Sequence, residues 1–157
     1  MEKMRILIAA VGRAKAGPER ILFEHYQARL QAPFSLQLRE VEEKRAFHGA
    51  QLKEREATLL QGCVTDGAIV IALDEREESL SSKDFAEKIG DWRDQGIRDL
   101  VFMIGGADGL DEVIRKKARQ TMSFGAQTWP HMLVRGLLAE QLYRAQCILG
   151  GHPYHRE

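Results

Sequence analysis

Three short and almost wholly apolar runs constrain the fold of this chain more than any other feature of its sequence. They occupy residues 5–11, 68–73 and 100–104. A strand has this composition when it is buried on both faces, as in a parallel sheet that helices cover on both sides. Residues 34–41 instead alternate apolar and polar side chains, which is typical of a half-buried strand.

The segments between these runs are expected to be helices. The first begins at Pro18 and extends to residue 30. The side chains that the helical spacing places on one face of this helix are Ile21, Leu22, His25, Tyr26 and Leu30. The other expected helices are residues 51–61, a helix capped by Ser81 or Ser82 that Gly96 ends, and a short helix from a cap at Asp111 to residue 119.

Apolar strands that alternate with amphipathic helices predict an α/β fold, with a largely parallel sheet flanked by helices. The 157 residues suffice for one domain, which spans residues 1–157. The last helix, residues 130–149, is apolar on more than one face. Because a lone surface helix needs only one apolar stripe, we expect this helix to pack on the sheet and on a second subunit. The sequence therefore predicts a homodimer.

The charges of the chain balance, with 23 Lys and Arg against 23 Asp and Glu. Net charge gives no support for nucleic-acid binding, so contacts with phosphate would have to come from local basic patches. The candidates are Arg13 with Lys15 and the stretch that contains Arg115, Lys116, Lys117 and Arg119. The alternative is that each stretch is a solvated helix face or loop.

The cysteines, the histidines and the lengths of the apolar runs argue against a disulfide-bonded, a metal-binding and a membrane-spanning protein, respectively. Cys63 and Cys147 form no C-x-x-C motif, which favours a reduced, cytoplasmic setting. No apolar run approaches the length of a membrane span, so we expect no membrane partner. His152 and His155 have H-x-x-H spacing without a clear third ligand, so we expect no metal.

Two predicted strand ends are candidate ligand sites, because ligands of open α/β sheets bind beyond the carboxyl ends of the strands. One is Leu73 with Asp74, and the other is the glycine-rich stretch 105–109, GGADG. That stretch does not fit the dinucleotide fingerprint, and Asp108 and Asp111 add negative charge where a phosphate would need none. A ligand without phosphate and with positive charge fits better, and S-adenosylmethionine has both properties.

Four motifs occur in order along the second half of the chain. They are FMIGGADGL at 102–110, TWPH at 128–131, LAEQLYRA at 138–145 and HPYHR at 152–156. On these motifs the chain resembles the SPOUT-class ribosomal RNA large-subunit methyltransferase H family, which methylates N3 of a pseudouridine in 23S ribosomal RNA. The resemblance covers nearly the whole chain.

The resemblance implies a parallel sheet with a deep trefoil knot near the C-terminus, a homodimer, and 23S ribosomal RNA in the ribosome as partner. It also implies a cleft for S-adenosylmethionine that the loops of the knot form. The matching positions are Leu73, Gly106, Gly125, Ala126, Gln127, Thr128, Trp129 and Pro130. Two departures from the family pattern are the charged turn 76–78, where a Gly-Lys-like turn is usual, and Gly136, where a larger aliphatic residue is common.

The C-terminal tail supplies the candidate catalytic residues Tyr154, His155 and Arg156. By our hypothesis Arg156 and His155 orient the base and stabilise its developing negative charge, while Tyr154 stacks on it or bonds to it. The alternative is that Pro153 and Tyr154 only pin the tail to the body of the protein. In the last helix, Arg135, Glu140 and Arg144 are expected either to form ion pairs at the subunit interface or to contact RNA.

Two other functions remain open at this point. One is a SPOUT-type methyltransferase with a different acceptor, such as the ribose of a transfer RNA. The other is a ribosome-associated binding protein that keeps the fold without catalysis.

Overall fold

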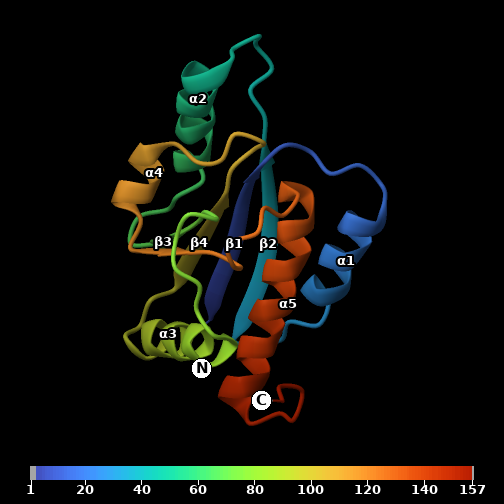
Figure 1. Ribbon diagram of the computed structural model, residues 1–157. Coiled ribbons are helices and arrows are strands. Elements are labelled where there is room, and N and C mark those ends of the chain that lie inside the picture. Colours follow the sequence, from blue (N-terminus) through green and yellow to red (C-terminus); the bar gives the residue numbers. More distant parts are fainter. Residues whose placement is uncertain (1–2, 157) are drawn as a thin grey trace.

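A computed structural model describes residues 3–156 and shows a five-stranded sheet between two layers of helices (Figure 1). The strands are β1 (Met4–Val11), β2 (Phe34–Val41), β3 (Ile69–Leu73), β4 (Asp99–Ile104) and β5 (Gln120–Met122). The helices are α1 (Pro18–Gln27), α2 (Gly49–Gln61), α3 (Ser82–Asp94), α4 (Glu112–Lys117) and α5 (His131–Gly150). The strand order is β2-β1-β4-β3-β5, and every paired strand is parallel.

The sheet is covered on both faces, which confirms the inference from the apolar runs. Along β4, Leu100, Phe102 and Ile104 point into the core under α1, α3 and α5, whereas Val101 and Met103 point into the core under α2 and α4. Alternate residues of one strand thus enter opposite cores, which is why residues 100–104 are all apolar.

The strand β5 was not predicted, and its composition explains why. It has three residues, Gln120, Thr121 and Met122, and it pairs with β3 alone at the edge of the sheet. A strand this short has neither an apolar run nor a resolvable alternation. Its position matters, because it brings the segment that leads to α5 beside the end of β3.

The predicted helix caps are confirmed, whereas the predicted face of the first helix is partly wrong. The side chains of Ser81 and Asp111 accept hydrogen bonds from the first turns of α3 and α4. In α1 the buried residue is Phe23, while Ile21 is 68% exposed and His25 is also exposed. Residues two apart lie about 200° apart around a helix, so burial of Phe23 turns Ile21 outward.

Helix α5 lies across the middle of one face of the sheet and packs against both α1 and α3 (Figure 1). Its close approach to α1 depends on Gly136. A Cβ atom at this position would lie 2.6 Å from Cδ2 and 2.7 Å from Cγ of Leu22. The structure thus explains why this position does not hold a larger residue.

We expect Gly136→Ala to destabilise the protein, although alanine is the better helix former by about 1 kcal/mol. The added methyl group would force Leu22 and α1 away from α5, and overpacking of this kind costs roughly 1–3 kcal/mol. Thermal unfolding measures the change. Gly150→Ala in the same helix is the matched control, because its Cβ would have no neighbour within 4 Å. Equal melting temperatures for the two variants would contradict the close approach.

Candidate functional site

A cavity of about 500 Å³ opens at the carboxyl ends of β3 and β4. Three loops and the start of α5 surround it: residues 73–76 after β3, residues 104–109 after β4, and residues 123–130 between β5 and α5. This is the position at which an open parallel sheet binds ligands. The two strand ends that the sequence singled out therefore face one common cavity.

Seven of the eight predicted cofactor positions line this cavity. They are Leu73, Gly106, Gly125, Gln127, Thr128, Trp129 and Pro130. Ala126 is exposed and lies outside the lining. Asp74, which the sequence singled out with Leu73, also lines the cavity. Sequence reasoning missed Glu75 and Arg76 in the loop after β3, and His131 and Val134 at the start of α5.

The glycines of the loop after β4 are needed for its tight turn. A Cβ at Gly105 would lie 2.6 Å from the carbonyl carbon of Gly109, and Gly109 has a φ of +82°. The Gly109 N–H donates to the Gly106 carbonyl at 3.0 Å and closes the turn. Because the glycines have no side chains, a ligand in the cavity can approach the main chain of this loop closely at their positions.

The charges around the cavity disfavour a phosphate ligand. Asp74, Glu75 and Asp108 line it, and the only basic side chains among its lining residues are those of Arg76 and His131. Arg76 is engaged with Asp74 at 2.7 Å, and burial together with nearby Arg135 lowers the pKa of His131. The lining therefore suits a ligand without phosphate, as the sequence predicted.

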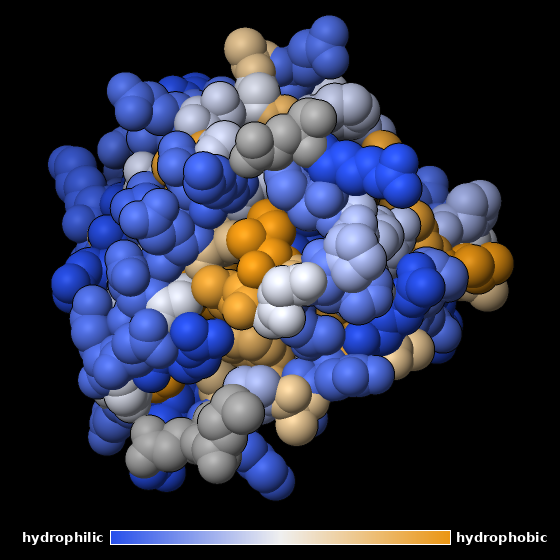
Figure 2. Space-filling view, turned by 90° about the horizontal axis from the view of Figure 1, so that it is seen from below, coloured by the Kyte–Doolittle hydropathy of each residue, from blue (hydrophilic) through white to orange (hydrophobic). Residues whose placement is uncertain are grey.

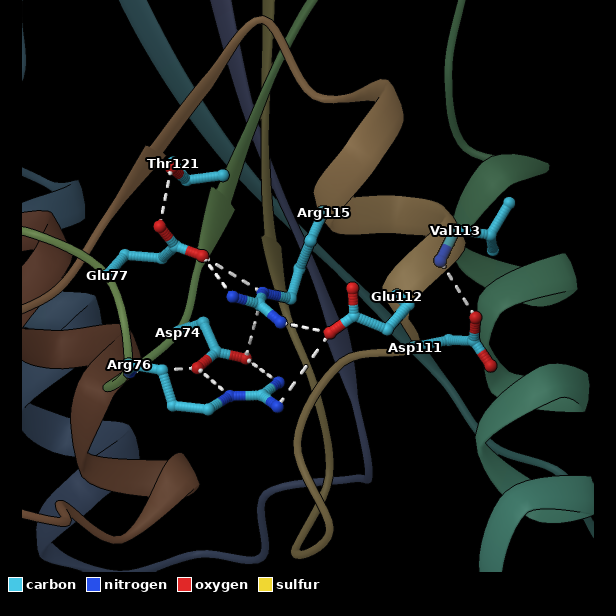
Figure 3. Close-up of polar contacts among 8 residues, drawn as sticks. All are labelled: Asp74, Arg76, Glu77, Asp111, Glu112, Val113, Arg115 and Thr121. Carbon is cyan, nitrogen blue, oxygen red and sulfur yellow. Dashed lines mark hydrogen bonds and ion pairs between the residues drawn. The ribbon is translucent and has the colours of Figure 1, made fainter.

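A cluster of polar side chains, two of which line the cavity, joins the loop after β3 to α4 and β5 (Figure 3). We call it the loop cluster; it consists of Asp74, Arg76, Glu77, Glu112, Arg115 and Thr121. Arg76 donates to both carboxylate oxygens of Asp74, and Arg115 from α4 donates to Glu77 and Glu112. Arg115 is thus held by carboxylates inside the protein, which corrects its assignment to a basic patch. Lys116, Lys117 and Arg119 remain exposed.

The C-terminal tail folds back along α5. The Tyr154 hydroxyl donates to Glu140 at 3.2 Å, its ring lies 4.8 Å from that of Tyr143, and the Arg144 guanidinium lies 4.8 Å from the Tyr154 ring centre. Arg144 also contacts Nδ1 of His155 at 3.0 Å. The structure therefore brings Tyr154 and His155 together on Glu140 and Arg144, whereas Arg156 is exposed.

The tail and the first cavity border a common wall. A second cavity contains Tyr154, Glu140 and Arg144 on one side and Phe124, Gly125 and Trp129 on the other. The last three residues also line the first cavity. Trp129, which is 40% exposed, thus stands between the predicted cofactor cleft and the predicted catalytic tail.

Protonation in the tail favours hydrogen-bond donation. Burial, then contact with Tyr26 and Glu140, raises the pKa of Tyr154, so its phenol keeps its proton. A guanidinium can only donate, so His155 Nδ1 accepts from Arg144 and the imidazole hydrogen lies on Nε2. The one hydroxyl hydrogen of Tyr154 is donated to Glu140, so the Nε2–H of His155 is the donor of this pair that can stabilise negative charge on a base.

Arg135 has a role that the sequence did not predict. It is 1% exposed, and it bonds Glu40 at 2.6 Å and the carbonyl oxygens of Val11 and Gly12 at 3.0 and 2.7 Å. The expectation of an interface or RNA contact is therefore wrong for Arg135. It joins the ends of β1 and β2 to the first turns of α5, next to the cavity residues His131 and Val134.

Glu56 of α2 is a second buried group that sequence reasoning missed. Its carboxylate would lie 3.3 Å from a Cβ at Gly106, on the side of the loop that faces α2. Burial, and then the nearby charge of Asp108, raises the pKa of Glu56. A glutamate in an amphipathic helix is ordinarily solvated, so the sequence carried no signal of this position.

Neither a metal centre nor a membrane segment is seen in the part of the chain that the structure describes. Among residues 3–156, no three His, Cys, Asp or Glu side chains gather as metal ligands would. None of the helices within these residues has the length and apolar character needed to cross a bilayer.

Comparison with known proteins gives a consistent result. A family model described as "Predicted SPOUT methyltransferase" matches residues 4–155. A Paramagnetospirillum magneticum protein named Ribosomal RNA large subunit methyltransferase H is 58% identical over 153 residues, which cover 98% of this chain and 99% of that protein. A protein of the same name from Rhodospirillum centenum is 57% identical over the same shares of the two chains.

A solved structure supports the fold. A probable methylase family protein from Haemophilus influenzae matches 99% of this chain and 71% of its own, with a TM-score of 0.56 and 12% sequence identity. At that identity the similarity concerns the arrangement of strands and helices alone.

We expect Glu40→Gln to destabilise the protein by about 2 kcal/mol at pH 7, because the buried Arg135 would lose its charged partner. Burial alone would raise the pKa of Glu40, but the Ala14 N–H and Arg135 outweigh it and lower that pKa from its usual 4.5. The stabilisation is therefore present above pH 4.5 and is lost as the pH falls through the lowered pKa. Denaturant unfolding between pH 7 and pH 3 measures it.

Glu42→Gln is the control, because its partner Arg13 is 3.7 Å away and both side chains are exposed. We expect it to change the free energy of unfolding by less than about 0.5 kcal/mol. A Glu40→Gln variant as stable as this control at pH 7 would contradict the role of the buried pair.

Proposed function

The chain belongs to the SPOUT methyltransferase family, and from this premise we propose that it methylates ribosomal RNA of the large subunit. The observation that carries the proposal is the 58% identity, over nearly the full length of both chains, to a protein named Ribosomal RNA large subunit methyltransferase H. The proposed site of this reaction is the cavity at the carboxyl ends of β3 and β4.

The proposed methyl donor is S-adenosylmethionine, and the residues of the cavity fit it. The volume of the cavity, about 500 Å³, lies within the usual range of small-molecule sites. The main chain of residues 105–109 and 123–130 would hold the adenosine, because the glycines there leave peptide groups accessible. Asp74, Glu75 and Asp108 give the lining a negative character that suits a cation without phosphate. When bound, S-adenosylmethionine supplies an electrophilic methyl group.

The proposed acceptor is N3 of a pseudouridine in 23S ribosomal RNA. This nitrogen lies between two carbonyl groups, so it is weakly acidic, and donors that stabilise its anion promote the loss of its proton. His155 offers an N–H next to Arg144, and Tyr154, whose O–H is donated to Glu140, offers its aromatic ring. We assign these groups, with Arg156, to orient the base and to stabilise its negative charge. Glu140 holds Tyr154 and Arg144 in place.

We also propose that the chain forms a trefoil knot. Contacts between two of its loops support this proposal. Ser123 N–H donates to the Glu78 carbonyl at 3.1 Å, and Ser79 pairs with Ser123. The loop after β3 thus lies directly on the segment that leads into α5.

Because the proposed acceptor belongs to ribosomal RNA, we propose that the protein acts in the cytoplasm.

The proposed homodimer is supported by exposed apolar surface. Leu22, Phe124, Trp129 and Leu137 line the open groove between α1, α3 and α5. Apolar residues also gather, surrounded by hydrophilic ones, on the face seen from the end of the molecule at which α3 lies (Figure 2). A patch of this kind marks an interaction site in a protein of this size.

The test of the function is methyl transfer from labelled S-adenosylmethionine to purified 70S ribosomes, to separated subunits and to bulk transfer RNA. We expect label in 23S ribosomal RNA from ribosomes that lack the modification. Label in transfer RNA alone would support another acceptor. Cofactor binding without label in any RNA would support a protein that has lost catalysis.

A variant that lacks residues 154–157 tests the role of the tail. We expect it to lose activity while it keeps its fold and binds cofactor; unchanged activity would leave the tail only a structural role.

The test of the dimer is sedimentation at micromolar concentration. We expect the mass of two chains for the wild-type protein. Leu137→Glu, which places a charge in the groove, is expected to shift the mass to that of one chain without unfolding. A wild-type monomer at this concentration would refute the proposed dimer.

A further inference from the structure

The loop after β3 is held at its two ends by main-chain bonds, whereas its middle depends on side chains. At the start, Asp74 N–H donates to the Met122 carbonyl at 3.0 Å, and at the end Glu78 accepts from Ser123 N–H. Between them, residues 75–77 have one main-chain bond, from Glu77 N–H to the Asp74 carbonyl. The loop cluster supplies the other contacts of this segment (Figure 3).

Arg115 is the side chain that joins this segment to the rest of the fold. It reaches from α4 to Glu77, lies 3.8 Å from Asp74 and also bonds Glu112. Thr121 of β5 donates to the second oxygen of Glu77 at 3.1 Å. The side chain of Asp74 is 4% exposed and that of Arg115 is 18% exposed, so these interactions are screened less than ordinary surface ion pairs.

The segment that Arg115 holds is a wall of the predicted cofactor cavity. Leu73, Asp74, Glu75 and Arg76 all line that cavity, whereas Arg115 and Glu77 do not. Arg115 therefore affects a ligand only through the loop. The charged turn at 76–78, where the family usually has a Gly-Lys-like turn, supplies the Arg76 and Glu77 that make this attachment possible.

We propose that Arg115 is a positioning residue for the cofactor, because it holds residues 74–77 in the conformation that forms the cavity wall. This inference rests on the proposed function, since the ligand is S-adenosylmethionine. Loss of Arg115 would leave the wall correctly placed in only a fraction of the molecules. If that fraction is one tenth, the apparent Kd of the cofactor rises about tenfold.

The charge of the cluster allows this role to be separated from a simple electrostatic one. Three carboxylates and two guanidinium groups leave one excess negative charge, and Arg115→Met would raise the excess to two. An electric field alone would then bind the cationic S-adenosylmethionine more tightly and leave S-adenosylhomocysteine, which lacks the sulfonium charge, nearly unchanged. Loss of positioning weakens both ligands by a similar factor.

The experiment measures calorimetric Kd values for S-adenosylmethionine and S-adenosylhomocysteine with the full-length wild type and with Arg115→Met, Arg115→Lys, Thr121→Val and Lys117→Met. Lys117→Met is the control, since it removes one positive charge from an exposed position of the same helix. Circular dichroism checks the fold. Methyl transfer at saturating cofactor separates the kcat from the KM of the cofactor.

We expect Arg115→Met to weaken both ligands about tenfold, with a raised KM and a kcat within twofold of the wild type. Arg115→Lys is expected to fall between it and the wild type, because lysine keeps the charge but lacks the planar fork with which two N–H groups of Arg115 bond Glu77. Thr121→Val is also expected to be intermediate, because it removes one bond to Glu77 and leaves those of Arg115. Folded Arg115→Met with wild-type affinity for both ligands, or with tighter S-adenosylmethionine alone, would overturn the inference. A wild type that binds neither ligand would overturn the proposed function as well.

Discussion

Burial of the sheet on both faces is the constraint on which the rest of the structure depends. Residues 100–104 of β4 all enter one core or the other, so the middle of the sheet has no room for a ligand. The cavity lies instead at the strand ends, where the loops after β3 and β4 meet the segment between β5 and α5. The cavity forms there because its walls come from loops that the sheet fixes at their bases.

Buried charges then attach these loops to the helices. Arg135 joins α5 to the ends of β1 and β2 through Glu40 and two carbonyl oxygens, and Arg115 joins α4 to the loop after β3. On α5, Glu140 and Arg144 hold the folded-back tail. In each case a guanidinium group bonds two or more partners at once, in the fixed planar geometry that a lysine ammonium does not have. The neutral net charge of the chain therefore hides paired charges that give the candidate site its shape.

The sequence predicted those parts of the fold that follow from local patterns. The three apolar runs and the alternating segment 34–41 predicted four strands, and Ser81 and Asp111 predicted two caps, because burial and capping act on neighbouring residues. The strand β5 escaped prediction because three residues at an edge have no pattern. The positions of Arg135, Glu40 and Glu56 also escaped, since their partners lie far away in sequence. The residues of the cofactor cleft were predicted only through the resemblance to a family, and the structure gathers seven of them around one cavity.

The central claim is that the cavity at the carboxyl ends of β3 and β4 holds the methyl donor. Ultraviolet cross-linking of labelled S-adenosylmethionine to the full-length protein, followed by mass-spectrometric mapping of the labelled peptide, tests it most directly. The account predicts label within residues 123–131 or 104–109, which line the cavity, and its loss on competition with S-adenosylhomocysteine. Specific, competed label confined to α1 or α2, neither of which lines the cavity, would contradict it.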